Sequence, residues 1–350
     1  MSEPLVTEIT RRAMATEFGV VIAGRPGNAV EVAIEALDDL GRLESLMSVH
    51  QPASQVSEIN RLAGVRPVRV APELIEVLTR AVAIAELTGG AFDVTAGPLV
   101  RCWGFTQRRG QKPSDDAIRE ALASVGSHRL RIDTAKQTVM LADAGMEINL
   151  GGIGKGFALD QIVSRLEAHG CHRFLVHGGR STVVARGSGC DEPEQGWRVA
   201  LEHPLRTGIR LGEVRLRDQA LSTSGSGKQF FHWRGRRLGH VLDPRTGYPT
   251  GDMLSLTVLT ESGTDADALS TACFVEGWRT TAMRIGNTTT GPPPTTPPTS
   301  RRPHWPTAAI AVLPREQGEG VEIRRWGADL NLDWTPAPTT TDQPVPKSLK

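Results

Sequence analysis

The sequence predicts an α+β fold in which helices and largely antiparallel strands mix without a regular β–α–β alternation. Two observations lead to this prediction. Apolar residues recur at helical spacing in most of the first half of the chain. After about residue 173, short apolar or alternating runs typical of strands dominate, and one further helical pattern follows them.

Five segments have the apolar periodicity of helices. In the first, Val30, Ile34 and Leu37 begin an apolar stripe. In the second, Pro72 stands in the first turn and Gly89-Gly90 follows the last turn, which are typical start and stop signals. The predicted helices occupy residues 28–47, 72–88, 114–125, 156–169 and 265–276.

The remaining periodic segments are short and predict strands. Residues 130–133 and 138–141 alternate like the two arms of a hairpin. The other predicted strands are residues 173–176, 182–185, 197–201, 211–214, 254–259 and 308–313.

Composition divides the chain into unequal parts. Residues 1–286 contain nearly all of the periodic segments and are expected to form one domain. Residues 287–307 are rich in Pro and Thr, cannot build a packed core, and are interpreted as an insertion or linker. Residues 308–334 are expected to return to the domain as strands, and residues 335–350 to form a disordered tail.

The charge balance and the absence of long apolar runs exclude several classes of partner. The 350-residue chain carries 40 Lys and Arg residues against 39 Asp and Glu residues, so no nucleic-acid partner is expected. No run approaches the roughly 18 apolar residues that span a bilayer, and no signal segment is evident, so we expect no membrane insertion and a cytoplasmic protein. The four cysteines are scattered, which disfavours a zinc site and a disulfide framework. The oligomeric state is left open.

The most informative segment runs from residue 148 to residue 160, where glycines cluster between a strand-like run and a helical pattern. Such a turn can present backbone N–H groups to a phosphate, and Lys155 adds a positive charge. The segment is not a Walker A loop, because Gly156 stands where a magnesium-binding Ser or Thr would be needed. An ordinary tight turn explains the glycines equally well.

Two further segments contain candidate functional side chains. In residues 89–105, Phe92 could stack on a planar ring and Asp93 could accept a hydrogen bond from a base or ribose; the alternative is an Asp that caps a turn. In the second, the Ser- and Gly-rich residues 222–228 suit a phosphate, and His240 precedes a tight turn where it could take a proton from a hydroxyl group. A lone histidine is more often structural.

The last candidate segment lies on the helix predicted for residues 265–276. Asp267 and Thr271 are four residues apart and therefore share one helix face. A carboxylate, a hydroxyl group and a nearby backbone carbonyl form an oxygen-rich site suited to magnesium. Capping of the helix is the alternative role for the carboxylate.

Taken in order along the chain, these segments resemble the ApbE family, the FAD:protein FMN transferases. The resemblance covers roughly residues 8 to 280, and several motifs in the family's order are more specific than any one of them. It runs through residues 13–18, 47–54, 57, 60, 90–93, 151–160, 176–179, 222–225, 240–247 and 266–274.

The resemblance implies an ApbE-like flavin transferase fold and a reaction. FAD would be split at its pyrophosphate, AMP would leave, and FMN would be attached by a phosphoester bond to a Ser or Thr hydroxyl group of an acceptor protein, with Mg2+ required. Residues at the family's FAD-contacting positions are Met14, His50, Ala91, Phe92, Asp93, Asn149, Lys155 and Val241. Those at its metal-binding positions are Gly152 (through its carbonyl), Asp267, Ser270 and Thr271, and His240 is the expected base.

Three residues depart from the family's pattern. His50 stands where an aromatic residue such as Tyr is common, Asn149 where many members carry Asp, and Arg180 where a small polar residue is frequent.

Two other functions could use the same site. An FAD pyrophosphatase would give AMP and free FMN, and a non-catalytic FAD-binding protein would release no AMP.

Overall fold

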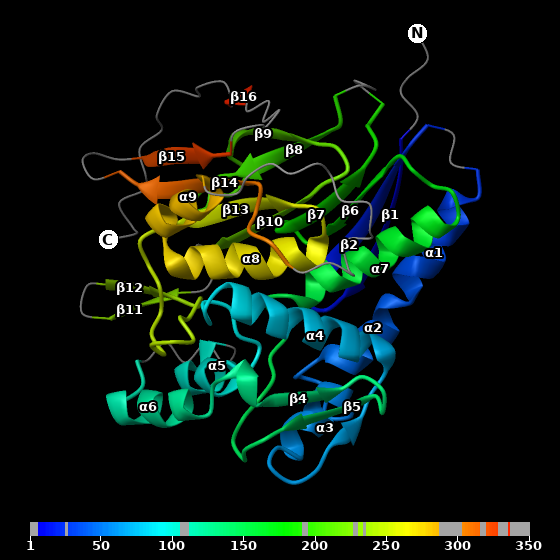
Figure 1. Ribbon diagram of the computed structural model, residues 1–350. Helices are drawn as coiled ribbons and strands as arrows, with labels where there is room; N and C mark the ends of the chain where they lie inside the picture. Colours follow the sequence, from blue (N-terminus) through cyan, green and yellow to red (C-terminus); the bar gives the residue numbers. More distant parts are fainter. Residues whose placement is uncertain are drawn as a thin grey trace.

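An eight-stranded antiparallel sheet organises the molecule (Figure 1). The computed structural model describes residues 6–24, 27–105, 112–190, 195–226, 230–233, 236–286, 303–315, 320–327 and 335–336. In sheet order, the eight strands are β1 (Val6–Ala13), β2 (Thr16–Ala23), β6 (Phe174–Gly178), β7 (Thr182–Arg186), β10 (Ala220–Gly225), β13 (Ser255–Thr260), β14 (Ala308–Pro314) and β15 (Val321–Trp326).

The two faces of this sheet bury different layers, because successive side chains of a strand point to opposite faces. Val184 and Val258 pack into the core beneath the helices, whereas Val183 and Leu259 pack against a second, three-stranded sheet. The helical layer contains α1 (Ala29–Asp38), α7 (Gly154–Ala168), α8 (Gly263–Glu276) and α9 (Trp278–Gly286). The second sheet contains β16 (Thr335–Pro336), β9 (Arg210–Leu216) and β8 (Trp197–Glu202).

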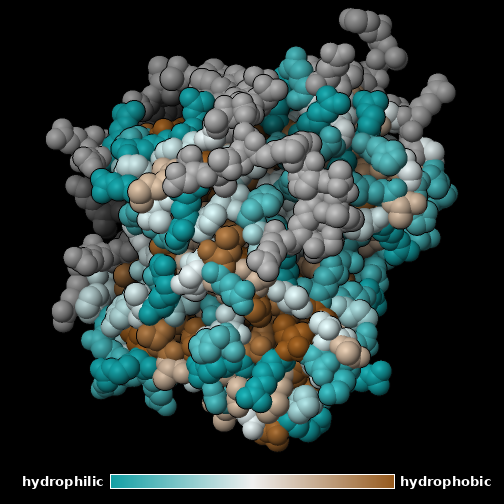
Figure 2. Space-filling model, in the orientation of Figure 1, coloured by the Kyte–Doolittle hydropathy of each residue, from teal (hydrophilic) through white to brown (hydrophobic). Residues whose placement is uncertain are grey.

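The remaining elements lie mostly on the side of the helical layer away from the large sheet (Figure 1). The helices are α2 (Leu40–Met47), α3 (Gln55–Arg61), α4 (Pro72–Leu87), α5 (Gly97–Trp103), α6 (Asp115–Ala123) and a 3-10 turn at Ser127–Arg129. The strands are β3 (Val68–Arg69), β5 (Thr138–Leu141), β4 (Leu130–Asp133) and the hairpin of β11 (Phe230–Trp233) and β12 (Arg236–Gly239). On the face shown in Figure 2, apolar residues reach the described surface mainly around α5, α6 and β4.

The mixture of helices and antiparallel sheets confirms the predicted α+β class. The predicted helices at residues 72–88, 114–125, 156–169 and 265–276 are α4, α6, α7 and α8, and the predicted hairpin is β4–β5. The helix predicted for residues 28–47 is instead two helices divided at Asp39. The carboxylate of Asp39 accepts hydrogen bonds from Arg42 Nε (2.8 Å) and Nη2 (2.9 Å) at the start of α2.

Other elements carry weak sequence signals. The strand β1 is mostly polar and half of its residues are exposed, so it has no apolar alternation, and α5 lies outside the five segments predicted to be helices. The predicted Pro/Thr-rich insertion (287–307) and tail (335–350) lie mostly outside the described residues. After residue 307 the chain enters the large sheet as β14, which pairs with β13 and then with β15. In the described part of the chain, no helix is both long and apolar enough to span a bilayer.

The helices α7 and α8 approach each other at two glycines. A Cβ atom on Gly156 would lie 2.0 Å from the carbonyl oxygen of Gly263, and a Cβ on Gly263 would lie 2.9 Å from the carbonyl oxygen of Gly156. Only residues without a side chain allow this approach, since real Cβ atoms essentially never come so close to backbone oxygen. The contact therefore places the N-terminal turns of both helices together.

The same contact is supported by a buried carboxylate. Asp160 of α7 accepts hydrogen bonds from the backbone N of Gly263 (2.7 Å) and from the backbone N (2.8 Å) and Oγ1 (2.6 Å) of Thr264 at the start of α8. Burial raises the pKa of the Asp160 carboxyl group, and these three hydrogen bonds act in the opposite direction. Asp160 thus satisfies backbone donors that the first turn of α8 would leave unpaired.

A buried ion pair fixes α8 to α4. Arg80 donates from Nε to Oδ1 of Asp265 (2.6 Å) and from Nη2 to Oδ2, and both side chains are almost fully buried. Removal of one partner of such a pair is costly, because it leaves an uncompensated buried charge. The start of α8 is therefore held by α7 on one side and by α4 on the other.

We expect Gly156→Ala to lower the free energy of unfolding by about 1–3 kcal/mol, because the added methyl group forces α7 and α8 apart. The matched control is Gly41→Ala in α2, where an added Cβ meets no atom within 4 Å. That substitution should raise the free energy of unfolding by up to about 1 kcal/mol, since Ala favours the helix. Urea denaturation measures both values, and equal effects would contradict the proposed close contact.

Candidate functional site

The glycine-rich segment makes the turn that starts α7. The side chain of Asn149 accepts a hydrogen bond from the backbone N of Gly151 (2.9 Å), and the backbone N of Gly154 donates to the carbonyl of Leu150 (2.8 Å). The helix begins at Gly154, so Lys155 lies in its first turn. Backbone N–H groups in the first turn of a helix lack intrahelical partners and favour an anion nearby.

Lys155 and Asp267, which are 112 residues apart, form an ion pair at this turn. The Nζ atom of Lys155 lies 3.1 Å from Oδ1 and 3.3 Å from Oδ2 of Asp267. The side chain of Asp267 is 7% exposed and that of Lys155 is 26% exposed, so Lys155 is the more accessible partner of the pair. The backbone N of Gly156 also donates to Oδ2 (3.1 Å).

Hydroxyl groups from two strands and α8 form a hydrogen-bonded cluster that reaches this carboxylate through Thr182. Ser224 Oγ lies 2.8 Å from Ser270 Oγ and 3.2 Å from Thr271 Oγ1. Ser222 Oγ lies 3.0 Å from Thr182 Oγ1, which donates to Oδ1 of Asp267 (3.5 Å). Because β7 and β10 are neighbours in the sheet and α8 packs against both strands, their hydroxyl groups lie next to those of α8.

The position of Gly152 connects this cluster to Phe92. A Cβ on Gly152 would lie 3.3 Å from Phe92 Cε2 and 3.4 Å from Thr271 Oγ1. Phe92 is almost fully buried, and Ala91 is completely buried. The structure therefore brings together Phe92, Gly152, Lys155, Asp267, Ser270 and Thr271.

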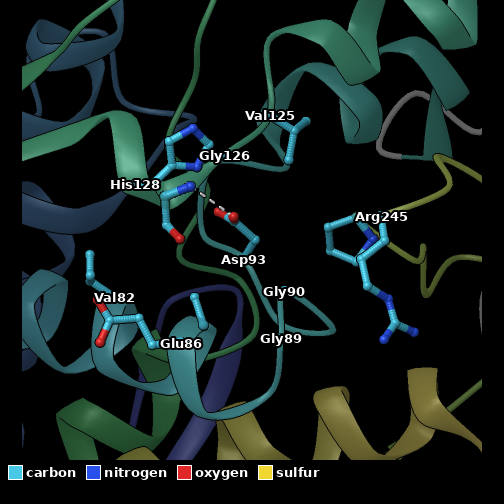
Figure 3. Close-up of a pocket in the computed structure, with 12 residues that line it drawn as sticks. Val82, Glu86, Gly89, Gly90, Asp93, Val125, Gly126, His128 and Arg245 are labelled. Carbon is cyan, nitrogen blue, oxygen red and sulfur yellow. Dashed lines mark hydrogen bonds between the residues drawn. The ribbon is translucent and has the colours of Figure 1, made fainter.

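Asp93 is engaged within its own turn. Its Oδ1 accepts hydrogen bonds from the backbone N (2.8 Å) and Oγ1 (2.6 Å) of Thr95, and its Oδ2 accepts from the backbone N of Ser127 (2.9 Å). This is the turn-capping role that the sequence left open as the alternative. The side chain borders a cavity of about 330 Å³ with Glu86 and His128, and Arg245 lies on the opposite side (Figure 3).

His50 and Asn149 border a second cavity, of about 280 Å³, together with Asn60 and Arg101. The side chain of Asn60 makes two hydrogen bonds with Ile148: its Nδ2 donates to the carbonyl (3.0 Å) and its Oδ1 accepts from the backbone N (2.7 Å). This pairing holds the chain that leads into the glycine-rich turn. The backbone N of Asn149 donates to the carbonyl of Val94 (2.7 Å), which ties the turn to the Phe92 segment.

Met14 occupies the tip of the β1–β2 hairpin with a positive φ of 49°, and Ala15 follows with a φ of 59°. These are unusual values for residues other than glycine. The backbone N of Met14 donates to Oε2 of Glu44 in α2 (2.9 Å), and its side chain packs against the main core. The hairpin tip is thus fixed to the helical part of the molecule.

His240 follows β12 and is half-buried, and Val241, next to it, is buried in the main core. The following turn is held by Asp243, which accepts hydrogen bonds from the backbone N (2.9 Å), Nε (2.9 Å) and Nη2 (3.0 Å) of Arg245. The Cγ atom of Arg245 would lie 3.6 Å from a Cβ on Gly90, so this turn lies beside the segment that contains Phe92.

Sequence reasoning missed three groups at the site. Thr182 is one Thr in a buried strand, and nothing in the local pattern indicates that its hydroxyl group reaches Asp267. Asp160 and Gly156 lie inside the glycine-rich motif, but their role depends on α8, which is remote in sequence. For Asp160, the only signal in the sequence is that an acidic residue stands in the helical pattern directly after the glycine-rich turn.

Comparison with known proteins agrees with the resemblance. A model of the ApbE family matches residues 14–290. The chain is 35% identical over 273 residues to the FAD:protein FMN transferase of Treponema pallidum (strain Nichols), covering 74% of this chain and 75% of that protein. It is 33% identical over 252 residues to the protein of the same name from Haemophilus influenzae, covering 70% and 71%.

Solved structures share the fold. The crystal structure of the ApbE protein from Thermotoga maritima matches with a TM-score of 0.77 at 30% identity, covering 92% of this chain and 97% of that one. The flavin transferase ApbE from Vibrio cholerae matches with a TM-score of 0.75 at 25% identity and the same coverage. These matches confirm the predicted ApbE-like fold. Because the family model and these relatives span most of the chain, the protein belongs to the ApbE family.

Proposed function

We propose that this protein transfers the FMN part of FAD to a Ser or Thr hydroxyl group of an acceptor protein and releases AMP. The observation that carries this proposal is the meeting of Lys155, Asp267 and several hydroxyl groups at the N-terminal turn of α7. The names of the curated relatives support it, since they are FAD:protein FMN transferases. The acceptor is proposed to be a cytoplasmic protein, and that location stays a prediction.

The proposed metal site has the donor atoms that magnesium prefers. In the described residues, no three His, Cys, Asp or Glu side chains converge, so a carboxylate-rich site is not available there. The set of Asp267, Ser270, Thr271 and the Gly152 carbonyl is nevertheless all oxygen, as a hard cation requires. Bound there, Mg2+ would offset the charge of the pyrophosphate and polarise the bond that breaks.

The chain's own residues would hold the FAD around this point. The ammonium group of Lys155 suits the diphosphate, and so does the positive end of the α7 helix dipole. The cavity between His50 and Asn149 lies next to the turn and offers room for a ring system of FAD. Met14, Ala91, Phe92, Asp93 and Val241 are the remaining proposed contacts. For Asp93 the contact would be made by the backbone, because its carboxylate is engaged within the protein.

His240 is proposed to take the proton from the acceptor's hydroxyl group as that oxygen attacks the FMN phosphorus. The bond from this phosphorus to the bridging pyrophosphate oxygen then breaks, and AMP leaves with the bridging oxygen. A neutral imidazole suits this role near neutral pH. The half-buried position of His240, at the end of β12 and before a rigid turn, supports the proposal.

Incubation of the purified protein with FAD, Mg2+ and a candidate acceptor domain tests the reaction. We expect the acceptor to gain the mass of an FMN phosphoester while AMP appears in equal amount. Intact-mass spectrometry and an AMP assay measure the two products. AMP with free FMN and no adduct would instead indicate a pyrophosphatase, and FAD binding without AMP would indicate a binding protein.

We expect Asp267→Ala to reduce metal-dependent AMP release at least about a hundredfold, because the charge stabilisation by a bound metal is worth several kcal/mol. FAD binding, followed by quenching of flavin fluorescence, should remain. The control is Asp116→Ala, which removes a carboxylate that is 86% exposed on α6. Undiminished turnover in Asp267→Ala would remove this residue from the metal site.

We expect His240→Ala to slow FMN transfer about a hundredfold or more, which is the usual contribution of a general base. The melting temperature should change little, because the side chain is only half-buried. His169→Ala provides the control, since His169 is an exposed residue just after α7. A transfer rate that is unchanged in His240→Ala would mean that another group accepts the proton.

A further inference from the structure

The carboxylate of Asp267 is held from two directions. On the protein side, Gly156 donates its backbone N–H to Oδ2 and Thr182 donates its hydroxyl group to Oδ1. The second direction is that of the more exposed Lys155, whose ammonium group lies within 3.3 Å of both carboxylate oxygens. The first two donors belong to a helix and a central strand, whereas the ammonium group ends a flexible four-carbon stem.

The ammonium group therefore lies where a divalent cation would have to bind this carboxylate. Each carboxylate oxygen already accepts a hydrogen bond from the protein side, Oδ2 from Gly156 N (3.1 Å) and Oδ1 from Thr182 Oγ1 (3.5 Å), and the Nζ atom of Lys155 lies within 3.3 Å of both oxygens. Two cations on one carboxylate at this distance would repel each other strongly in a partly buried site. Binding of the metal thus requires that Lys155 move, and Lys155 is the more exposed of the two partners.

We propose that Lys155 is an exchangeable substitute for the metal ion, which couples the binding of FAD to the binding of the cation. Without FAD, the ammonium group neutralises Asp267 and keeps the affinity for divalent cations low. When the diphosphate of FAD enters, it attracts the ammonium group and leaves Asp267 open to the cation. This inference rests on the proposed function for the identity of the diphosphate ligand.

Two physical arguments support the exchange. A buried carboxylate without a positive partner is costly, so the protein needs one cation at Asp267 at all times, and the structure supplies it from within the chain. Coupling between two ligands is also reciprocal. If FAD raises the affinity for the metal ion, the metal ion must raise the affinity for FAD by the same factor.

The first test measures the affinity of the FAD-free protein for Mn2+, used in place of magnesium, by electron paramagnetic resonance of the free ion. We expect Lys155→Met to bind Mn2+ at least about tenfold more tightly than the wild-type protein, which is within the usual range of such couplings. Lys155→Arg should remain weak, because it keeps the positive charge at the carboxylate. Lys155→Gln provides a second neutral variant if Lys155→Met does not fold.

Two controls separate this exchange from a general change in charge. Lys136→Met removes an exposed lysine that pairs with Asp133 (3.2 Å) and should leave the Mn2+ affinity unchanged. In Lys155→Met/Asp267→Asn, the gain in affinity should disappear. A gain that survives in the double variant, or no gain in either neutral Lys155 variant, would overturn the proposal.

The second test uses the wild-type protein alone. FAD, titrated by quenching of its fluorescence and read before AMP accumulates, should bind at least about fivefold more tightly with saturating Mn2+ than without it. Equal affinities would overturn the coupling. The proposed function is tested separately by the transfer assay. An active wild-type enzyme without the Mn2+ effects would overturn only the exchange, and the expected Mn2+ effects in an inactive protein would overturn only the transferase.

Discussion

The close contact between α7 and α8 determines where the two charged groups of the candidate site, Lys155 and Asp267, lie. Gly156 and Gly263 allow the two helix starts to touch, and Asp160 satisfies the backbone donors at the start of α8. Only at this separation can the backbone N of Gly156 reach the carboxylate of Asp267. The ion pair between Arg80 and Asp265 fixes α8 from its other side, so the position of Asp267 is determined by three helices together.

The polar groups at the site are stable in a buried place because they satisfy one another. Thr182, Ser222 and Ser270 are fully buried, and each of their hydroxyl groups lies within hydrogen-bonding distance of another oxygen of the cluster. Buried polar groups that are paired in this way add rigidity, whereas a single unpaired group would be costly. The large sheet thus presents an ordered row of oxygen atoms toward α8.

Patterns local to the sequence could predict the helix α4 and the hairpin β4–β5, because their apolar spacing is regular. In α8, which is buried on nearly all sides, the four-residue spacing of Asp267 and Thr271 placed both residues on one helix face. It could not reveal the ion pair of Lys155 with Asp267, which depends on the packing of α7 against α8. Two other features could not be predicted from the apolar pattern. The division at Asp39 does not interrupt the apolar stripe of the two helices, and the edge strand β1 is too polar to form an apolar alternation.

The order of strands in the large sheet has a consequence for folding. The neighbours β7 and β10, which carry the hydroxyl groups, are separated in the chain by the pair β8–β9, and β10 also pairs with β13, which directly precedes α8. Contacts between such distant segments form slowly, because each requires closure of a long loop. The hydroxyl groups and Asp267 can therefore meet only in a chain whose middle strands are paired, and a partly folded chain without this pairing has no assembled site.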